Sequence, residues 1–471
     1  MKRGVVTAAV VMGVVLTAMD TSIMGVAMPR VASELGGFAL YSWVFSVYVL
    51  TSTTALPMFG RLADLWGRRA VFVICSSIFM LGSALCAGSS TMPALIAARA
   101  VQGVGGGGLY PLGMTIIGDI YAIDQRAKIE AMLSSAWGVS SAAAVVLGGL
   151  IVDHASWRWI FVINLPVGGL AIALVWIGLR ETIEARKVRI DVAGPLLLTS
   201  ATATLLMALG QSEGQDPLVV LGAPLGTFAL IVTSIALSCG FILVERHAAD
   251  PMVPLRLLRR PVIAIPCVGN FLAGGALLGF ASYVPLFVQS AMGHSAIISG
   301  LALTPASVGW PIGAYFSARL ISKGGFKRLA LAGAAVGALG SAALLGSARY
   351  QTLSGIGASM FVVGLGVGAL ITIFVIAAQN AVDWARRGIV TALLEFSSTL
   401  GASIWVAIMG AVAGAAIGQV RTDLSVSREA MAHAIERVFL IALGLGIAAV
   451  IVTTFFPRTP QEVQRQKAAA L

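Results

Sequence analysis

Long apolar runs follow one another along almost the whole of this sequence. A helix needs about 20 apolar residues to cross the hydrocarbon core of a bilayer. Of the 471 residues, 58% are hydrophobic and 11% are charged, whereas about a quarter of the residues of a soluble domain are charged. The sequence therefore predicts an all-α membrane protein. We expect fourteen transmembrane helices, at residues 5–28, 41–60, 70–89, 92–118, 129–151, 158–179, 192–210, 218–244, 262–289, 296–318, 329–347, 352–379, 389–418 and 435–456.

Positive charges are distributed unequally between the predicted loops. With a cytoplasmic N-terminus, 24 of the 31 lysines and arginines fall on the inner side, six fall on the outer side, and Arg99 lies within a span. Lysine and arginine are enriched in cytoplasmic loops, so we expect both termini in the cytoplasm. Because the basic residues are scattered in short loops, the net charge of +11 indicates orientation in the membrane and no nucleic-acid partner.

The chain also contains a weak internal repeat. The stretch GRLADLWGRR at 60–69 returns as ARLISKGGFK at 318–327, a shift of 258, and VQGVGGGG from Val101 resembles VVGLGVGA from Val362, a shift of 261. Parallel repeats are typical of transporters that bind substrate between two halves near the bilayer midplane. We expect a six-helix bundle at 1–190, two inserted transmembrane helices and a linker at 191–245, and a second six-helix bundle at 246–471.

The 60–69 stretch is a short cytoplasmic connection with four charges and two glycines. Its glycines allow two helix ends to approach closely. Asp64 falls where the next helix is expected to begin, and a carboxylate there can cap that helix or pair with an arginine. One interpretation is a solvated turn whose arginines orient the protein. The other is a conformational latch between transport states, formed by Gly60, Asp64, Gly67, Arg68 and Arg69.

Three ionisable residues stand out inside predicted spans, where a charge costs at least about 2.5–3.5 kcal/mol. At 1.5 Å per residue, Asp20 and Arg99 both lie about 10–14 Å below the outer surface, so they can form an ion pair. Glu395 lies about 10 Å from the inner face and has no evident partner. These groups are either structural, as a permanent ion pair and a neutral hydrogen-bonded acid, or they couple transport to protons. In the second case a cationic substrate competes with the proton for a carboxylate.

No cofactor and no metal are expected. Residues 103–108 match the dinucleotide pattern GxGxxG, but no strand precedes them and they lie inside a predicted span. The chain has no GxxxxGK[ST] phosphate loop for ATP, and its four histidines show no metal-binding spacing. Seven side chains within spans are candidates for lining an apolar substrate cavity, although each also suits helix packing or lipid contact: Met24, Trp137, Asn270, Phe271, Tyr283, Phe287 and Trp405.

Recognisable motifs cover nearly the whole chain: AMDTSIMGVAMP (18–29), WVFSVYVL (43–50), LIAARAVQGVGGG (95–107), WRWIFVINLPVG (157–168), ERHAADPMVPLRLLRRP (245–261) and YVPLFVQ (283–289). With the 60–69 stretch, they resemble the major facilitator superfamily and, within it, the fourteen-span drug:proton antiporter branch. The resemblance implies an inner-side latch at Asp64, Arg68 and Arg69, and a part for Arg99 in proton coupling. It also implies a monomer in the plasma membrane of a bacterium.

The resemblance implies a secondary active transporter that exports hydrophobic, cationic compounds in exchange for protons, conferring multidrug and antibiotic resistance. Members of the branch usually carry a Gly-Pro bend in span 5, where this chain has Ala144 and Val145. That departure leaves open a dedicated exporter of an endogenous lipid or secondary metabolite. A membrane-embedded enzyme is a third class, but the sequence shows no nucleophile–base pair or metal cluster at one depth.

Overall fold

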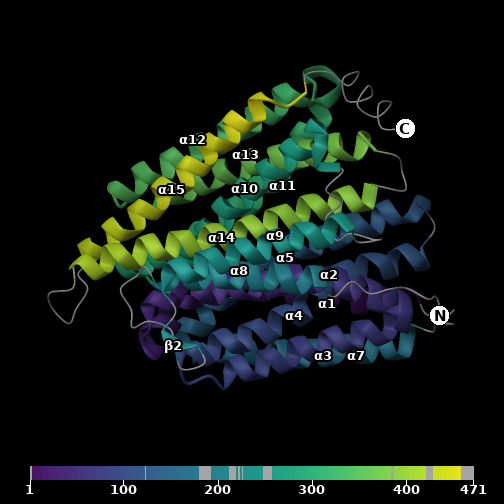
Figure 1. Cartoon of the computed structure of the whole chain (residues 1–471), viewed down its shortest axis with the longest axis horizontal. Helices are drawn as coiled ribbons and strands as arrows, with labels where there is room; N and C mark the ends of the chain where they lie inside the picture. Colours follow the sequence, from purple (N-terminus) through teal and green to yellow (C-terminus); the bar gives the residue numbers. More distant parts are fainter. Residues whose placement is uncertain are drawn as a thin grey trace. The chain divides into compact units, whose positions relative to one another are not determined.

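The computed structural model describes residues 3–121, 123–179, 193–211, 219–220, 223–224, 226–247, 257–382, 387–420 and 428–457. Some side chains within these ranges, including those of Arg61, Asp64 and Ser322, lie outside the description. The described chain is helical apart from one antiparallel pairing, of β1 (Val219–Val220) with β2 (Ala223–Pro224) (Figure 1). It divides into two compact units, Met1–Met252 and Val253–Leu471.

The helices of the first unit are α1 (Arg3–Leu35), the 3-10 turn η1 (Phe38–Leu40), α2 (Tyr41–Trp66), α3 (Arg68–Ala87), α4 (Met92–Ile120), α5 (Ile123–His154), α6 (Trp159–Val162), α7 (Asn164–Gly178), α8 (Ala193–Gln211) and α9 (Thr227–His247). Those of the second unit are the 3-10 turn η2 (Leu257–Arg259), α10 (Pro261–Leu286), the π-helical turn η3 (Phe287–Ala291), α11 (Ala296–Gly324), α12 (Phe326–Arg349), α13 (Leu353–Asn380), α14 (Arg387–Val420) and α15 (Arg428–Thr454).

Both units use the same pattern of helix contacts. In the first unit α4 packs against α2 and α3, α1 packs against α5 and α7, and α3 packs against α7. In the second unit α13 packs against α11 and α12, α10 packs against α14 and α15, and α12 packs against α15. The internal repeat predicted from the sequence is therefore present in the packing. Helices α8 and α9 pack against each other, and α8 also packs against α2, so their contacts join them to the first unit.

Glycines on α4 and α13 explain why the repeat is visible in the sequence. A Cβ atom at Gly107 would overlap the carbonyl oxygen of Ser52 on α2, and one at Gly105 would overlap the backbone of Phe79 on α3. Gly103 likewise lies against α2. Without side chains, these positions let the three helix backbones pack closely, as small residues do in membrane helix interfaces. The glycines 261 positions later make the matching contacts, Gly364 and Gly368 with α11 and Gly366 with α12.

The turn between α2 and α3 also recurs. Gly67 has φ 87° and ψ 151°, and Gly325, which is 258 positions later between α11 and α12, has φ 69° and ψ 159°. In practice only glycine adopts these backbone angles. The shared motif of the two loops therefore preserves a backbone conformation that closes each pair of antiparallel helices.

Two expectations for this loop are wrong. Asp64 does not begin the next helix, because α2 continues to Trp66 and the N-cap of α3 is Gly67, which makes no side-chain capping bond. Gly60 does not mark a close approach, since no described atom lies within 4 Å of a Cβ atom built there. The apolar pattern indicated where α2 lies but not how far it extends past the apolar residues.

Twelve of the described helices are long and apolar enough to cross a membrane, so this is a multi-pass membrane protein. Two of the fourteen predicted spans, at α4 and α8, are not among these twelve. Helix α4 carries Arg99, Gln102 and a run of glycines, which lower its hydropathy. In α8 the continuous apolar stretch whose side chains are described is Leu196–Leu205, so the span predicted at 192–210 is not tested over its full length.

The glycine contacts generate a stability prediction. Replacing Gly107 by alanine should destabilise the fold by about 1–3 kcal/mol, the usual effect of forcing an extra methyl group into a packed interior. Gly169→Ala on α7 is the matched control, because a Cβ atom there meets nothing within 4 Å. The measurement is the thermal unfolding midpoint of the purified protein in detergent. Equal midpoints for the two variants would contradict the close-packing explanation.

Candidate functional site

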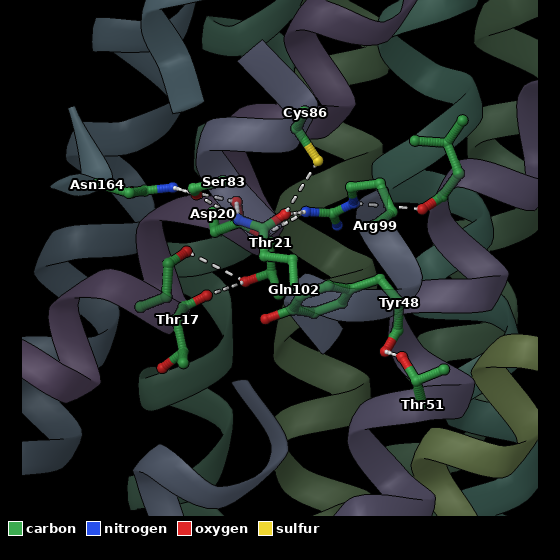
Figure 2. A network of polar contacts seen from close by, with 12 residues as sticks. Thr17, Asp20, Thr21, Tyr48, Thr51, Ser83, Cys86, Arg99, Gln102 and Asn164 are labelled. Carbon is green, nitrogen blue, oxygen red and sulfur yellow. Dashed lines mark hydrogen bonds and ion pairs between the residues drawn. The ribbon is translucent and has the colours of Figure 1, made fainter. Parts of the chain in front are cut away.

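The centre of the first unit holds a buried ion pair. Arg99 Nη1 on α4 lies 2.6 Å from Asp20 Oδ2 on α1, and each residue is 1% exposed. The depth argument made from the sequence predicted this pair, and its presence is confirmed. Figure 2 shows that the two side chains belong to a larger polar network inside the helix bundle.

Gln102 joins the two members of the pair. It lies three residues after Arg99, so both side chains share one face of α4. Its Oε1 accepts a hydrogen bond from Arg99 Nη1 at 2.7 Å, and its Nε2 donates to Asp20 Oδ1 at 2.7 Å. The carboxamide orientation is thereby determined, because Arg99 requires an acceptor and the carboxylate requires a donor.

Ser83 on α3 and Asn164 on α7 complete the network. Ser83 Oγ accepts from Gln102 Nε2 at 2.8 Å and from Asn164 Nδ2 at 2.9 Å. Asn164 Nδ2 also lies 3.4 Å from Asp20 Oδ1. In Figure 2 these two residues lie to the left of Asp20 and Arg99 lies to the right. Side chains from α1, α3, α4 and α7 therefore meet around one carboxylate.

Local structure explains how Asn164 and Ser83 come to lie in the network. Asn164 begins α7 just after a break at Ile163, and Pro166 has no N–H to donate to the carbonyl of Val162, as a continuous helix would require. Ser83 follows Gly82, where a Cβ atom would overlap the backbone of Gln102. This close approach of α3 to α4 brings the serine hydroxyl within reach of the glutamine carboxamide.

The guanidinium of Arg99 has further partners on α2. Its Nε donates to the carbonyl oxygen of Val44 at 3.4 Å, and its Cζ lies 4.0 Å from the centre of the Tyr48 ring. An arginine over an aromatic face within about 6 Å is stabilised by a cation–π interaction. Two opposite charges, with hydrogen bonds around them, can remain ionised in a low-dielectric interior that would strongly disfavour either charge alone.

Sequence reasoning missed Gln102, Ser83 and Asn164. The signal for Gln102 was its spacing from Arg99 within one quoted motif, and the signal for Asn164 was a carboxamide within an apolar span. Ser83 had no such signal, since serines are frequent in this chain's spans. Only the packing of α3 against α4 and α7 shows its role.

Glu395 lies in the second unit, on α14. Its side chain is exposed, and among the described side chains it has no ion-pair or hydrogen-bond partner. Its carbonyl oxygen accepts from the hydroxyl of Thr399 at 3.0 Å. The neighbouring positions Ser398 and Gly401 pack against α10. One face of α14 is therefore packed, and the side chain of Glu395 lies outside this contact. The two predicted acids thus have opposite surroundings.

The predicted latch residues contact other helices at the end of the first unit opposite η1. Arg68 Nε lies 3.0 Å from Asp119 Oδ2, which joins the start of α3 to the end of α4. Arg69 Nη1 donates to the carbonyl oxygen of Leu179 at 3.4 Å, and its Cζ lies 4.3 Å from the Trp176 ring centre. An arginine at a helix N-terminus opposes the helix dipole, and Asp119 offsets this charge. Asp119 was not predicted, and the side chain of Asp64 lies outside the described residues.

The candidate cavity residues divide into two groups. Met24, Asn270, Tyr283 and Phe287 are buried, with at most 2% of each exposed. For these four residues, a place in the lining of a substrate cavity stays a prediction. The remaining three keep some exposed surface and stay predictions: Trp137, which contacts Tyr110, and Phe271 with Trp405, whose ring centres are 6.4 Å apart.

Comparison with known proteins identifies the family. The sequence profile of the Major Facilitator Superfamily matches residues 10–406. A Bacillus subtilis (strain 168) protein named multidrug transporter protein MdtP is 34% identical over 427 residues, covering 90% of this chain and 77% of that protein. The chain belongs to the major facilitator superfamily. It is accordingly a transporter and not an enzyme.

Two further similarities agree with this assignment. Multidrug resistance protein 3 of Bacillus subtilis (strain 168) is 30% identical to this major facilitator transporter over 404 residues, covering 85% of this chain and 78% of that protein. The crystal structure of a bacterial homologue of the human lysosomal transporter Spinster, inward-facing and unoccupied, matches with a TM-score of 0.68 and 15% identity, covering 96% of this chain and 97% of that chain. At that identity the likeness concerns the fold alone.

The buried pair predicts strongly non-additive effects on stability in this transporter. Arg99→Met should lower the free energy of unfolding by about 3–5 kcal/mol, because it leaves the Asp20 carboxylate buried without its counter-charge. Adding Asp20→Asn should recover part of that loss. Arg349→Met, at an exposed arginine that ends α12, is the control and should change stability little. Additive losses in the double variant, measured by unfolding in detergent, would show that the two charges do not interact.

Proposed function

We propose that this major facilitator transporter exports hydrophobic, cationic compounds in exchange for protons, by alternating access. We further propose that it belongs to the fourteen-span drug:proton antiporter branch, acts as a monomer in a bacterial plasma membrane, and keeps both termini in the cytoplasm. The inserted pair is α8 and α9, between two six-helix bundles. Relatives named as a multidrug transporter and a multidrug resistance protein support the substrate class.

The observation that carries the proposal is the buried Asp20–Arg99 pair at the centre of the first unit. Asp20 and Arg99 are fully buried among membrane helices. Ionisable residues at such positions are rare because they are costly, and they often mark proton relays and ion pathways. Each proton that moves down a potential of 100 mV releases about 2.3 kcal/mol, which is enough to bias a two-state carrier.

The burial of Asp20 supports alternating access. In this structure its carboxylate is enclosed and bonded to Arg99, Gln102 and Asn164. A proton from solution therefore needs a second conformation in which this network opens. We assign the inner-side cluster of Arg68, Arg69 and Asp119 to the latch that holds the ends of α3, α4 and α7 in one of the two conformations.

Glu395 suits a different task. A carboxylate that makes no ion pair or hydrogen bond with the described side chains is available to a cation, whereas Asp20 would first have to leave its partners. We therefore assign recognition of cationic substrates to Glu395 and proton coupling to Asp20 with Arg99. Glu395 can also carry a proton when no substrate is bound, as the exchange mechanism requires.

A dedicated exporter of an endogenous lipid or secondary metabolite is the second candidate. Helix α5 supports it, because Ala144 and Val145 stand where drug antiporters of the branch usually carry Gly-Pro, and α5 contains no proline within its bounds. A growth panel with chemically unrelated toxic compounds separates the candidates. Protection against several of them favours multidrug export, and protection against none favours a single substrate.

The principal prediction concerns Asp20. In proteoliposomes that contain the purified full chain, a proton gradient should drive transport of a cationic dye, and Asp20→Asn should reduce this transport to the rate of protein-free vesicles. The control is Glu429→Gln, which removes an exposed acid from the first turn of α15 and should transport normally. Normal gradient-driven transport by Asp20→Asn would refute proton coupling at this site.

Removing the charge of Glu395 should affect cationic substrates but not neutral ones. A carboxylate about 4 Å from a cation contributes about 1 kcal/mol even at the dielectric constant of water, so Glu395→Gln should weaken the apparent affinity for cationic substrates about fivefold or more. Affinity for a neutral substrate of similar size should stay unchanged. The measurement is the concentration dependence of transport for the two substrates. An equal loss for both would indicate a structural role for Glu395.

A further inference from the structure

The Asp20 carboxylate is surrounded by hydrogen-bond donors only. Oδ2 accepts from Arg99 Nη1, and Oδ1 accepts from Gln102 Nε2 and Asn164 Nδ2. These are the hydrogen bonds that the described residues make to it. The nearby hydroxyls of Thr17 and Thr21 donate to carbonyl oxygens of their own helix. The hydrogen bonds that the described residues make to this carboxylate all come from donors, as an ionised carboxylate requires.

The same geometry restricts where a proton can be accommodated. A protonated carboxyl group is a donor at one oxygen and needs an acceptor there. On Oδ1 the new O–H would compete with two amide N–H groups, and on Oδ2 it would lie beside the guanidinium donor, with no acceptor among the hydrogen bonds that the described residues make to this carboxylate. A buried donor opposed by donors costs free energy, as an unsatisfied polar group does. At least one neighbour must therefore rearrange when Asp20 binds a proton.

Gln102 is the neighbour whose rearrangement has a further consequence. Rotating its carboxamide by half a turn would present Oε1 to Asp20 as the required acceptor. The same rotation would present Nε2 to Arg99, where a donor would then oppose a donor. One carboxamide can satisfy the ionised pair or the protonated acid, but not both together.

Ser83 allows this rotation at little cost. Its Oγ accepts from both carboxamides, and the described residues include no acceptor for its own hydroxyl hydrogen. After rotation of Gln102, that hydroxyl can donate to Oε1, so the serine serves either orientation. A carboxamide next to a hydroxyl can thus exchange donor for acceptor without losing its second partner.

We propose that Gln102 is the positioning residue that couples protonation of Asp20 to release of Arg99. In the ionised state its carboxamide holds both charges, and when Asp20 becomes neutral the rotated carboxamide favours separation of the guanidinium. This inference rests on the proposed proton exchange and assigns its first structural step to one side chain.

The charged and titratable groups around Asp20 are few. In the described part of the unit they are Arg99 from α4, Tyr48 from α2 and Cys86 from α3. The contact from α7 is the uncharged side chain of Asn164, and where α5 packs against α1, Gly148 lies against Ile23. A pH-dependent signal that disappears in Asp20→Asn can therefore be assigned to this carboxyl group.

The test measures protonation of Asp20 directly. Infrared difference spectra of the purified full chain, recorded across a pH series, report the protonated carboxyl band, and its loss in Asp20→Asn assigns it. Gln102→Met removes a charge-assisted donor at similar side-chain length, so the band should reach half its height about one to two pH units higher than in the unmodified chain.

The matched control is Gln379→Met on α13. It removes a carboxamide that is half-buried, whereas Gln102 is fully buried, and that donates to Thr391 Oγ1 at 2.9 Å in the second unit. This variant should leave the titration unchanged. If Gln102→Met does not fold, Asn164→Leu should shift the band in the same direction by a smaller amount, since its bond to Asp20 is longer. An unshifted band in the folded variant, or the same shift in Gln379→Met, overturns the proposal, as does the absence of any Asp20 band.

Release of Arg99 has its own measurement. Cys86 Sγ lies 3.7 Å from Gln102 Oε1, so opening of the network should expose this buried thiol, while the equally buried Cys75 on α3 serves as the reference. The ratio of Cys86 to Cys75 alkylation should rise several-fold in Asp20→Asn. An unchanged ratio would show that neutralising Asp20 does not open the network. Because neither measurement uses transport, failure here is distinguishable from failure of proton-driven export, which the dye assay tests.

Discussion

A pair of opposite charges can persist inside a membrane bundle only if the bundle itself supplies their partners. Asp20 and Arg99 satisfy this condition through groups on α2, α4 and α7, and Ser83 on α3 bonds to the two carboxamides that contact Asp20. Removing any one of these helices would leave a polar group unpaired in a medium where that is costly. The arrangement of the first unit around its ion pair is therefore as constrained as that of a packed core, and any change in the protonation of Asp20 must affect several helices at once.

Close packing makes this network possible. Glycines on α4 bring α2 and α3 against it, and Gly82 brings α3 to Gln102. The second unit repeats the backbone packing with Gly364, Gly366 and Gly368 but places no ion pair at its centre among the described residues. The same architecture thus supports a charged centre in one unit, while the other carries an exposed acid on α14. Such a difference suits a carrier in which one unit responds to protons and the other meets the substrate.

Sequence patterns predicted the fold better than the site. Apolar run length placed the helices, and depth along two antiparallel helices paired Asp20 with Arg99, because rise per residue is nearly constant. The same reasoning missed Ser83 and Asn164, since their roles depend on which faces of α3 and α7 turn inward. It also misplaced Asp64 at a helix start, because a helix can extend past its apolar residues into water. Which apolar side chains line a cavity cannot be predicted in this way either, because apolar character alone does not separate packing from exposure.

The sequence by itself determined that the chain is a multi-pass helical membrane protein with a repeated half, since the lengths of the apolar runs and the spacing of the glycines can be read directly from it. It also determined which side chains carry charge within the membrane. Only the tertiary structure decided what surrounds those charges. The donors that meet Asp20 come from residues 79, 82 and 144 positions away, and no local rule brings them together. Their convergence is a property of how the helices pack, because hydrogen bonds act over about 3 Å while the residues that make them are spread over three helices.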